Sequence, residues 1–181
     1  ALTRGKPLVR IGVIHPVESY WLHWGPAEQT FGIREQMDHN FQSLTNWLLN
    51  GSMDFDFISE SLLPSQCENA SAPLCVGQMA YDTILVPGCQ TLRSSTLERL
   101  EAFSRAGGNL IFLGDAPTLE NAVSSSRGET LWQTSRKAAF TQEAILEALK
   151  DSRILDIHNA DGSRTGNLIH QLREDNNGLW L

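Results

Sequence analysis

The sequence predicts an α/β fold of three layers, in which a mainly parallel sheet carries helices on both faces. Apolar runs of strand length alternate along the chain with longer segments whose apolar residues recur every three or four positions. Short turns containing Gly and Pro separate many of these segments. Alternation of strands and helices through short links is typical of a parallel sheet that is covered on both faces.

The first part of the chain predicts two strands and a long helix. Residues 8–14 are mostly apolar on both faces, which favours a buried strand. Residues 15–26 are expected to form a loop, and a helix is expected from about 28 to 50. Residues 55–59 then predict a short second strand. The helix would place one apolar face inward, made of Met37, Phe41, Leu44 and Leu48.

The middle of the chain predicts two further strands around a helix. Residues 64–78 contain Pro, Ser, Asn and Gly and are expected to be a loop. Residues 83–86 are apolar throughout, apart from the threonine that opens them, and predict a third strand that is buried on both faces. Residues 95–98 (Ser-Thr-Leu-Glu) have the spacing of a capping box and are expected to open a helix. Two glycines end that helix, and a fourth strand is expected at 109–113.

The later part of the chain is less regular. Residues 118–140 predict no element with a clear period. Residues 141–150 have the apolar spacing of a helix, and residues 153–157 are expected to form a further strand.

The last segment predicts a β-hairpin instead of a continuation of the α/β pattern. Residues 168–173 and 178–181 flank an acidic and Asn-rich turn at 174–177. We therefore expect an α/β domain over residues 1–160. Residues 161–181 are then expected to begin a following β module, as in a domain cut from a longer protein.

Composition limits the kinds of partner. The 14 basic and 21 acidic residues give a net charge of -7, without a basic stripe, so nucleic-acid binding is not expected. The sequence holds no apolar run of about 18 residues, so no membrane partner is expected. An acidic surface fits a cytoplasmic protein or a partner of neutral ligands such as sugars. The cysteines Cys67, Cys75 and Cys89 have no metal-site spacing, and neither a metal nor a cofactor is predicted.

Candidate binding residues follow the first predicted strand. In open parallel sheets, sites lie beyond the carboxyl ends of the strands, so the loops 15–26, 87–92 and 114–120 are expected to meet at one edge. Asp115 in the third loop is a weaker candidate, for a ligand hydroxyl or as a cap of its own turn. Aromatic faces suit sugar rings, although packing of the aromatic residues of the first loop against a neighbouring domain is the favoured interpretation. The first loop supplies His15, Glu18, Tyr20, Trp21 and Trp24.

Cys89 is the candidate nucleophile, in the turn Pro87-Gly88-Cys89-Gln90. A catalytic thiol needs a base, a lowered pKa and an oxyanion pocket. The sequence fixes no Lys or His beside Cys89, and the turn lacks the Gly-x-Cys-x-Gly form of a nucleophile elbow. A small side chain in a tight turn is therefore the favoured interpretation.

Two phrases carry a resemblance to a known superfamily. YDTILVPG at 81–88 and GGNLIFLGD at 107–115 resemble the class I glutamine amidotransferase-like domains, which have a flavodoxin-like fold. That resemblance implies a nucleophile directly after the strand at 109–113. This sequence has Gly114-Asp115-Ala116 there, and Cys89 lies one strand too early. The resemblance therefore implies the fold without the amidotransferase chemistry.

The chain is, more specifically, similar to the middle (trimerisation) domain of family-42 β-galactosidases. The similar segments are RIGVIHPVESYW, FDFISESLL, YDTILVPGCQTL and GGNLIFLGDAP. The resemblance implies a non-catalytic accessory domain of a bacterial glycoside hydrolase, which acts in interdomain packing or oligomerisation and could line the carbohydrate site. Its partners would be the other domains of the parent enzyme or further copies of the chain.

Two alternatives stay open at the level of sequence. The first is a stand-alone thiol-dependent amidotransferase-like or hydrolase-like enzyme that uses Cys89. The second is a small-molecule binding module, for example for a phosphate or nucleotide. The bulky HPVESYW stretch at 15–21 weakens the second alternative, because a phosphate loop after the first strand would be rich in glycine.

Overall fold

A five-stranded parallel sheet forms the centre of the molecule. In the computed structural model, which describes residues 3–181, the strand order is β11-β8-β6-β2-β3. All four neighbouring pairs are parallel. In chain order this is the 2-1-3-4-5 arrangement typical of flavodoxin-like folds, so the predicted parallel α/β sheet is confirmed. The strands are β2 (Ile11–Ile14), β3 (Phe55–Ile58), β6 (Thr83–Pro87), β8 (Asn109–Leu113) and β11 (Arg136–Ala138).

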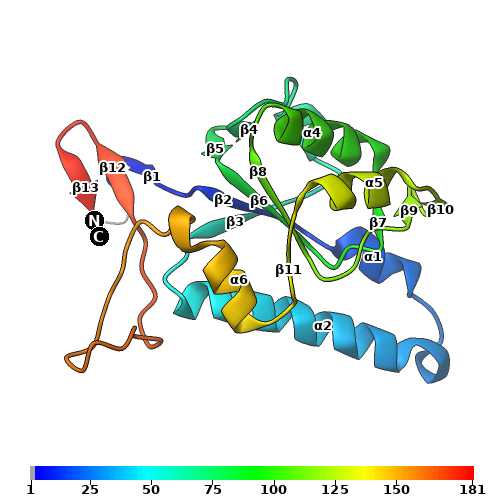
Figure 1. Cartoon of the computed structure of the whole chain (residues 1–181), viewed down its shortest axis with the longest axis horizontal. Coiled ribbons are helices and arrows are strands. Elements are labelled where there is room, and N and C mark those ends of the chain that lie inside the picture. Colours follow the sequence, from blue (N-terminus) through cyan, green and yellow to red (C-terminus); the bar gives the residue numbers. More distant parts are fainter. Residues whose placement is uncertain (1–2) are drawn as a thin grey trace.

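Helices cover both faces of this sheet (Figure 1). Helices α2 (Ala27–Asn50) and α6 (Gln142–Ala148) bury Leu44, Leu48 and Ile145 against one face. The opposite face is covered by α3 (Leu63–Gln66), α4 (Ser94–Arg105) and α5 (Arg127–Thr134). No helix among the described residues is long and apolar enough to cross a membrane.

The central strands are buried because they are apolar on both faces. Every residue of β2 and of β6 is buried, as expected for strands between two helical layers. Two hydrophobic clusters result, one on each side of the sheet. The predictions for these two strands, for β8 and for the long helix α2 are confirmed within a few residues.

Two segments that were expected to be loops contain regular structure. Residues 17–22 form the helix α1 (Val17–Leu22), directly after β2. Residues 64–78 contain most of α3 and part of an antiparallel hairpin of β4 (Leu74–Val76) and β5 (Met79–Tyr81). These helices and strands are each only a few residues long. They are therefore too short to show a clear hydrophobic period within the polar and Pro-containing sequence around them.

The fifth strand does not lie where the sequence predicted it. Residues 153–157 form no strand; they follow the short 3-10 helix η1 (Lys150–Ser152), where the Arg153 side chain hydrogen-bonds the Gly51 carbonyl oxygen at 3.3 Å. The strand at this edge of the sheet is instead β11, which lies within residues 118–140, where the sequence predicted no regular element. Its Arg136 and Lys137 are exposed, and such short, charged edge strands protect a sheet from pairing with other chains. They also lack the apolar run by which a strand is recognised.

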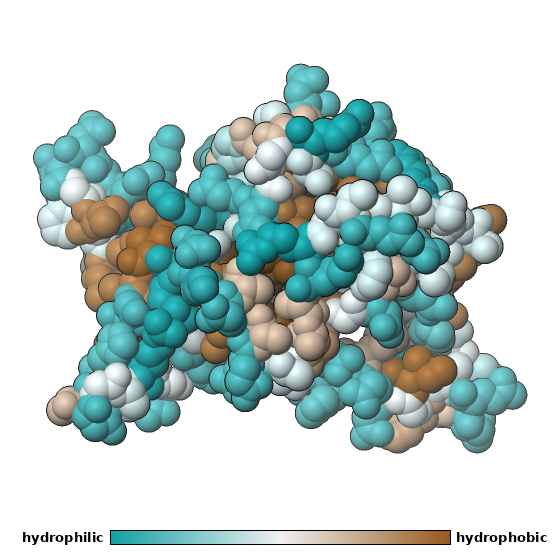
Figure 2. All heavy atoms as spheres, in the orientation of Figure 1, coloured by the Kyte–Doolittle hydropathy of each residue, from teal (hydrophilic) through white to brown (hydrophobic). Residues whose placement is uncertain are grey.

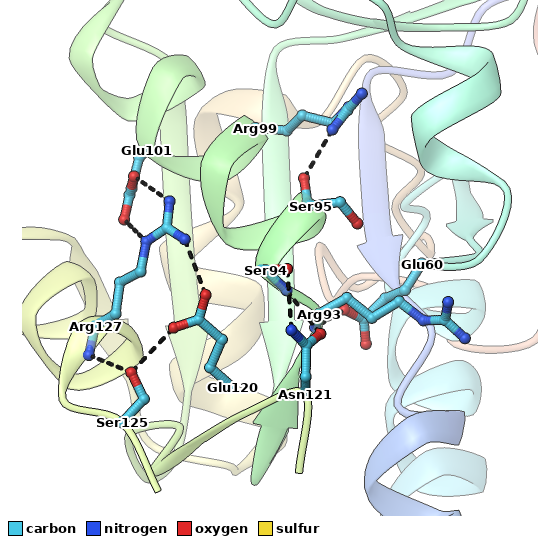
Figure 3. A network of polar contacts seen from close by, with 10 residues as sticks. All are labelled: Glu60, Arg93, Ser94, Ser95, Arg99, Glu101, Glu120, Asn121, Ser125 and Arg127. Atoms are coloured by element: carbon cyan, nitrogen blue, oxygen red, sulfur yellow. Dashed lines mark hydrogen bonds and ion pairs between the residues drawn. The ribbon is translucent and has the colours of Figure 1, made fainter. Parts of the chain in front are cut away.

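A small second sheet extends beyond the carboxyl ends of the central strands. It has the order β10-β9-β7, built from β7 (Thr91–Leu92), β9 (Leu119–Glu120) and β10 (Val123–Ser124). Arg127 at the start of α5 fixes this sheet to α4 (Figure 3). Its guanidinium binds both carboxylate oxygens of Glu101, at 2.6 and 2.9 Å, and Glu120 at 3.0 Å.

The predicted C-terminal hairpin is present, but its first strand begins later than predicted and includes residues 174–175, which were expected to belong to the turn. β12 (Arg173–Asp175) pairs with β13 (Gly178–Trp180) across a two-residue turn, and residues 168–172 are not a strand. β12 also pairs with β1 (Lys6–Pro7), which brings both ends of the chain together in Figure 1. The boundary between residues 160 and 161 stays a prediction.

Candidate functional site

The strand order reverses between β2 and β6, and the three predicted loops meet beyond that point. In such sheets the crevice at the carboxyl ends of these two strands is the usual place for a ligand. The Ser19 hydroxyl donates to the Thr91 carbonyl at 3.2 Å and accepts from the Thr91 N–H at 3.1 Å. His23 contacts the Gln90 side chain at 2.9 Å, and the Thr118 N–H donates to the Gln90 carbonyl at 3.1 Å. The expected gathering of these loops is therefore confirmed.

Helix α1 lies at this edge with a cavity on each side of it. The first, which we name the switch-point cavity, has a volume of about 260 Å³ and lies between α1, α2 and the ends of β2 and β6. The second, the rim cavity, has a volume of about 370 Å³ and lies between α1, β7 and the turn at 121–122. In a helix, residues three apart share a face, so Val17 and Tyr20 line the first cavity while Glu18 and Trp21 line the second.

His15 is the polar group at the inner end of the switch-point cavity. Its ring meets Phe41 and Phe57 edge-on, with ring centroids 5.2 and 5.6 Å apart. The ring makes no hydrogen bond with any residue that the structure describes. Partial burial lowers the pKa of His15, so the imidazole is neutral at pH 7 and offers one donor and one acceptor.

An ion pair forms one wall of the rim cavity. Glu18 Oε1 accepts from Arg93 at 2.7 Å (Nε) and 2.6 Å (Nη2). The Trp21 ring, 56% exposed, stands beside this pair. The cavity thus combines an aromatic face with a carboxylate, a guanidinium and the side chain of Asn121.

Side chains from outside α4 hold its first turn and with it Arg93 (Figure 3). The Arg93 N–H donates to Glu60 Oε2 at 2.8 Å, and the Ser94 N–H donates to Asn121 Oδ1 at 3.1 Å. The predicted capping box at 95–98 does not form, because the helix begins one residue earlier, at Ser94, and these distant groups satisfy its free N–H donors.

Glu60 is the buried charge of this network. Its side chain is 1% exposed, and burial is the main cause that raises its pKa. Neither Glu60 Oε1 nor the Thr96 hydroxyl has a partner with full hydrogen-bond geometry, although Thr96 lies close enough to Glu60 to offset part of the rise in its pKa. Glu60 follows a short strand in the stretch Ile58-Ser59-Glu60-Ser61, and no motif or spacing there distinguishes it from an exposed loop residue.

The other predicted site residues lie outside both cavities. Trp24 is 69% exposed, with the Arg34 guanidinium 5.0 Å from its ring centre. It lies at the start of an apolar patch with Phe31 and Ile33 over the beginning of α2, where Figure 2 shows hydrophobic atoms on the surface. Asp115 is exposed and makes no hydrogen bond with the described residues, so the cap expected of it is not formed.

Sequence comparison adds no assignment to this geometry. No protein-family model and no curated protein matches the chain. Function is therefore argued from the residues themselves. Two groups that sequence reasoning missed, Arg93 and Asn121, reach the rim cavity from a helix start and from a strained turn in which Asn121 has a φ of 50°. In the sequence, only its position just before a predicted helix could have marked Arg93 as a candidate binding residue.

Cys89 does not lie on the edge as a reactive thiol would. It is 2% exposed, its Sγ lies 3.8 Å from the Pro87 carbonyl oxygen, and it faces the hydrophobic cluster under α4. Burial, with a further contribution from the negative charge of Glu60, raises the pKa of the Cys89 thiol well above its usual value. Since the thiolate is the nucleophile, this environment suppresses the chemistry that the thiol-enzyme alternative needs.

Thiol labelling of the native chain is expected to separate the three cysteines. Cys75 is exposed and should react in a single fast phase, whereas Cys67 and Cys89, each 2% exposed, should react only as the protein opens. Mass spectrometry of alkylated peptides over time at pH 8 measures this difference. Labelling of Cys89 as fast as that of Cys75 would contradict the assignment and revive a thiol enzyme.

Proposed function

We propose that this chain is a non-catalytic accessory domain of a glycoside hydrolase, of the class I glutamine amidotransferase-like type, and that its rim cavity contacts carbohydrate. The glycoside hydrolase context rests on the sequence resemblance to the family-42 middle domain. The observation that carries the carbohydrate contact is the rim cavity, where the exposed Trp21 ring stands beside the Glu18–Arg93 ion pair.

The chemistry of this cavity suits a sugar. The face of an indole ring packs against the apolar face of a pyranose. The carboxylate of Glu18 accepts hydrogen bonds from hydroxyl groups, the guanidinium of Arg93 donates them, and the amide of Asn121 does both. A volume of about 370 Å³ lies within the range of small-molecule sites.

The same cavity lacks the groups that cleave a glycosidic bond. Hydrolysis uses two carboxyl groups that face one another across the bond. Glu18 is the only carboxylate among the residues that line the rim cavity, and it is paired with Arg93. The cavity is therefore suited to hold a sugar without cleaving it.

The apolar patch of Trp24, Phe31 and Ile33 supports the packing role that the resemblance implies. Their exposed fractions are 69%, 61% and 49%. Large exposed apolar side chains near the start of one helix are available for contact with another protein surface. Phe31 lines a surface hollow together with Tyr20, so a neighbouring domain or a second copy seated there would lie on the Tyr20 side of α1.

Titration with sugars tests the proposed function. We expect galactose, glucose or lactose to shift the Trp21 indole N–H resonance of the ¹⁵N-labelled chain, because Trp21 would pack on the ring. Trp21→Ala should weaken binding by about tenfold or more, the equivalent of about 1.4 kcal/mol. Trp180→Ala is the matched control, because Trp180 lies in the C-terminal hairpin and outside both cavities.

Three results would contradict the proposal. If none of the three sugars shifts the Trp21 signal, or if Trp180→Ala weakens binding as much as Trp21→Ala, the rim cavity is not a sugar site. Hydrolysis of 4-nitrophenyl galactoside by this chain, abolished in Glu18→Gln, would replace the accessory role with catalysis.

A further inference from the structure

We propose that the switch-point cavity is a second binding site, separate from the rim cavity, for a neutral aryl alcohol of one or two rings. This inference goes beyond the carbohydrate contact and does not depend on it. It rests on the position of the cavity, on the character of its walls and on the polar groups left without partners there.

The position is the one where the fold itself leaves a crevice. β2 and β6 are neighbours in the sheet; β2 leads through α1 to α2 on one face, and β6 leads through Gly88 and β7 to α4 on the opposite face. No strand continues over this point, so the crevice stays open between α1 and α2. His15 directly follows β2 and Pro87 is the last residue of β6, and both line the cavity.

The walls are mainly apolar and partly aromatic. Val17 comes from α1, Met37 and Phe41 from α2, and Phe140 from the segment after β11. Phe41 itself packs on Phe57, with ring centroids 4.9 Å apart, so this wall is supported from behind. A ring that enters would make edge-to-face or offset contacts with these aromatic side chains.

Three polar side chains at the cavity lack partners. The neutral imidazole of His15, the Tyr20 hydroxyl and the Asp38 carboxylate line it, and none of them makes a hydrogen bond to the described residues. One hydroxyl on a ligand can donate to one of these groups and accept from another. This number of groups matches a ligand with one or two hydroxyls on an otherwise apolar ring.

Charge excludes phosphate-bearing ligands. No Lys or Arg is among the lining residues, whereas Asp38 contributes a negative charge. His15 stays neutral because burial lowers its pKa, so it adds no positive charge at pH 7. A flavin or nucleotide phosphate at this point would meet neither a cation nor a Gly-rich loop.

A sugar fits this cavity less well than an aryl ring. A hexose carries hydroxyls around its whole edge, and most of them would face Val17, Met37, Phe41 or Phe140 without a partner, which is costly for each group. The volume of about 260 Å³ exceeds that of a cavity of roughly 150 Å³ known to admit benzene, so one or two fused rings can be accommodated.

The test uses phenol, 2-naphthol and indole-3-methanol as probes, with cyclohexanol, galactose and inorganic phosphate for comparison. Saturation-transfer NMR and calorimetry on the full chain measure binding. We expect the aryl alcohols to bind and phosphate not to bind. Val17→Phe and Met37→Trp fill the cavity from opposite walls, and each should weaken aryl binding at least tenfold. Val123→Phe and Ile33→Trp are matched controls on exposed positions outside the cavity and should leave it unchanged.

Each outcome decides the proposal. Circular dichroism first checks that each variant is folded. The two cavity-filling variants, Val17→Phe and Met37→Trp, act from different walls. If one of them misfolds, the other still serves as the test. Absence of aryl binding, or aryl binding that both fillers leave intact, would overturn the assignment. Tighter binding of galactose or phosphate, lost in the fillers, would assign the cavity to a different ligand class. Loss of sugar binding in Trp21→Ala with aryl binding retained would show that the two sites are separate.

Discussion

Replacing Gly108 by alanine is expected to lower the free energy of unfolding by about 1–3 kcal/mol. Gly108 lies between α4 and β8, and a methyl group built on it would overlap the ring of Phe103. Phe103 is a fully buried residue of α4 within the hydrophobic cluster, so its ring has no solvent-filled space into which it can turn. The Gly108 N–H also donates to the Phe103 carbonyl oxygen at 2.9 Å, which fixes the backbone at this close approach.

A second substitution shows whether this overlap is the cause. Phe103→Leu removes the part of the ring that the new methyl group would meet, at the cost of some packing. The double variant should therefore be more stable than the sum of the two single effects predicts, by about 1 kcal/mol or more. Guanidinium denaturation followed by circular dichroism measures all three variants. Strict additivity would mean that the methyl group is accommodated elsewhere.

Glu60→Gln is expected to raise the free energy of unfolding by about 1–2 kcal/mol at pH 7. The glutamine carbonyl can still accept from the Arg93 N–H, while its NH₂ group can donate to the Thr96 hydroxyl that now has no partner. The substitution also removes a charge from a fully buried position, where ionisation is costly.

The effect of Glu60→Gln should depend on pH in a defined direction. The pKa of Glu60 in the folded protein is raised above its ordinary value of 4.5, so the folded state binds this proton more tightly than the unfolded state. The native chain therefore loses stability as the pH rises from 4.5 through the folded pKa. The advantage of glutamine is largest above that pKa and shrinks as the pH falls toward 4.5.

Glu98→Gln, in the helix α4 whose start Glu60 contacts, is the matched control. Glu98 is exposed, so its substitution should change stability by less than about 0.5 kcal/mol at any pH. Urea denaturation of the two variants between pH 4 and pH 8 gives the comparison. If Glu60→Gln is instead less stable at every pH, the carboxylate is retained as an anion by the start of α4, and the burial argument fails.

The sheet was predictable from the sequence where burial determines composition. β2, β6 and β8 are apolar on both faces because helices cover both sides, and such runs are recognisable without a structure. β11 was not predictable, because an edge strand is stabilised by pairing with β8 while its Arg136 and Lys137 remain in solvent. The apolar residues at 153–157 were a misleading signal, since that segment pairs with no strand of the sheet and follows the short 3-10 helix η1.

The candidate site was predictable in its members but not in its arrangement. The sequence grouped His15, Glu18, Tyr20 and Trp21 as one set on a loop. The structure folds residues 17–22 into a helix, which sends Tyr20 and Trp21 to different cavities. The partners Arg93 and Asn121 come from segments more than 70 positions away, and that contact depends on tertiary packing alone.

Helix α1 consists of only six residues, and this shortness has a consequence for both cavities. A helix of this length does not hold its shape by itself and depends on what surrounds it. A ligand in the switch-point cavity would contact Tyr20 and a ligand in the rim cavity would contact Trp21. Both ligands would therefore stabilise the same short helix. The first ligand to bind would order this wall, so the second ligand would lose less conformational entropy on binding. Occupation of one site would therefore favour occupation of the other without any change of fold.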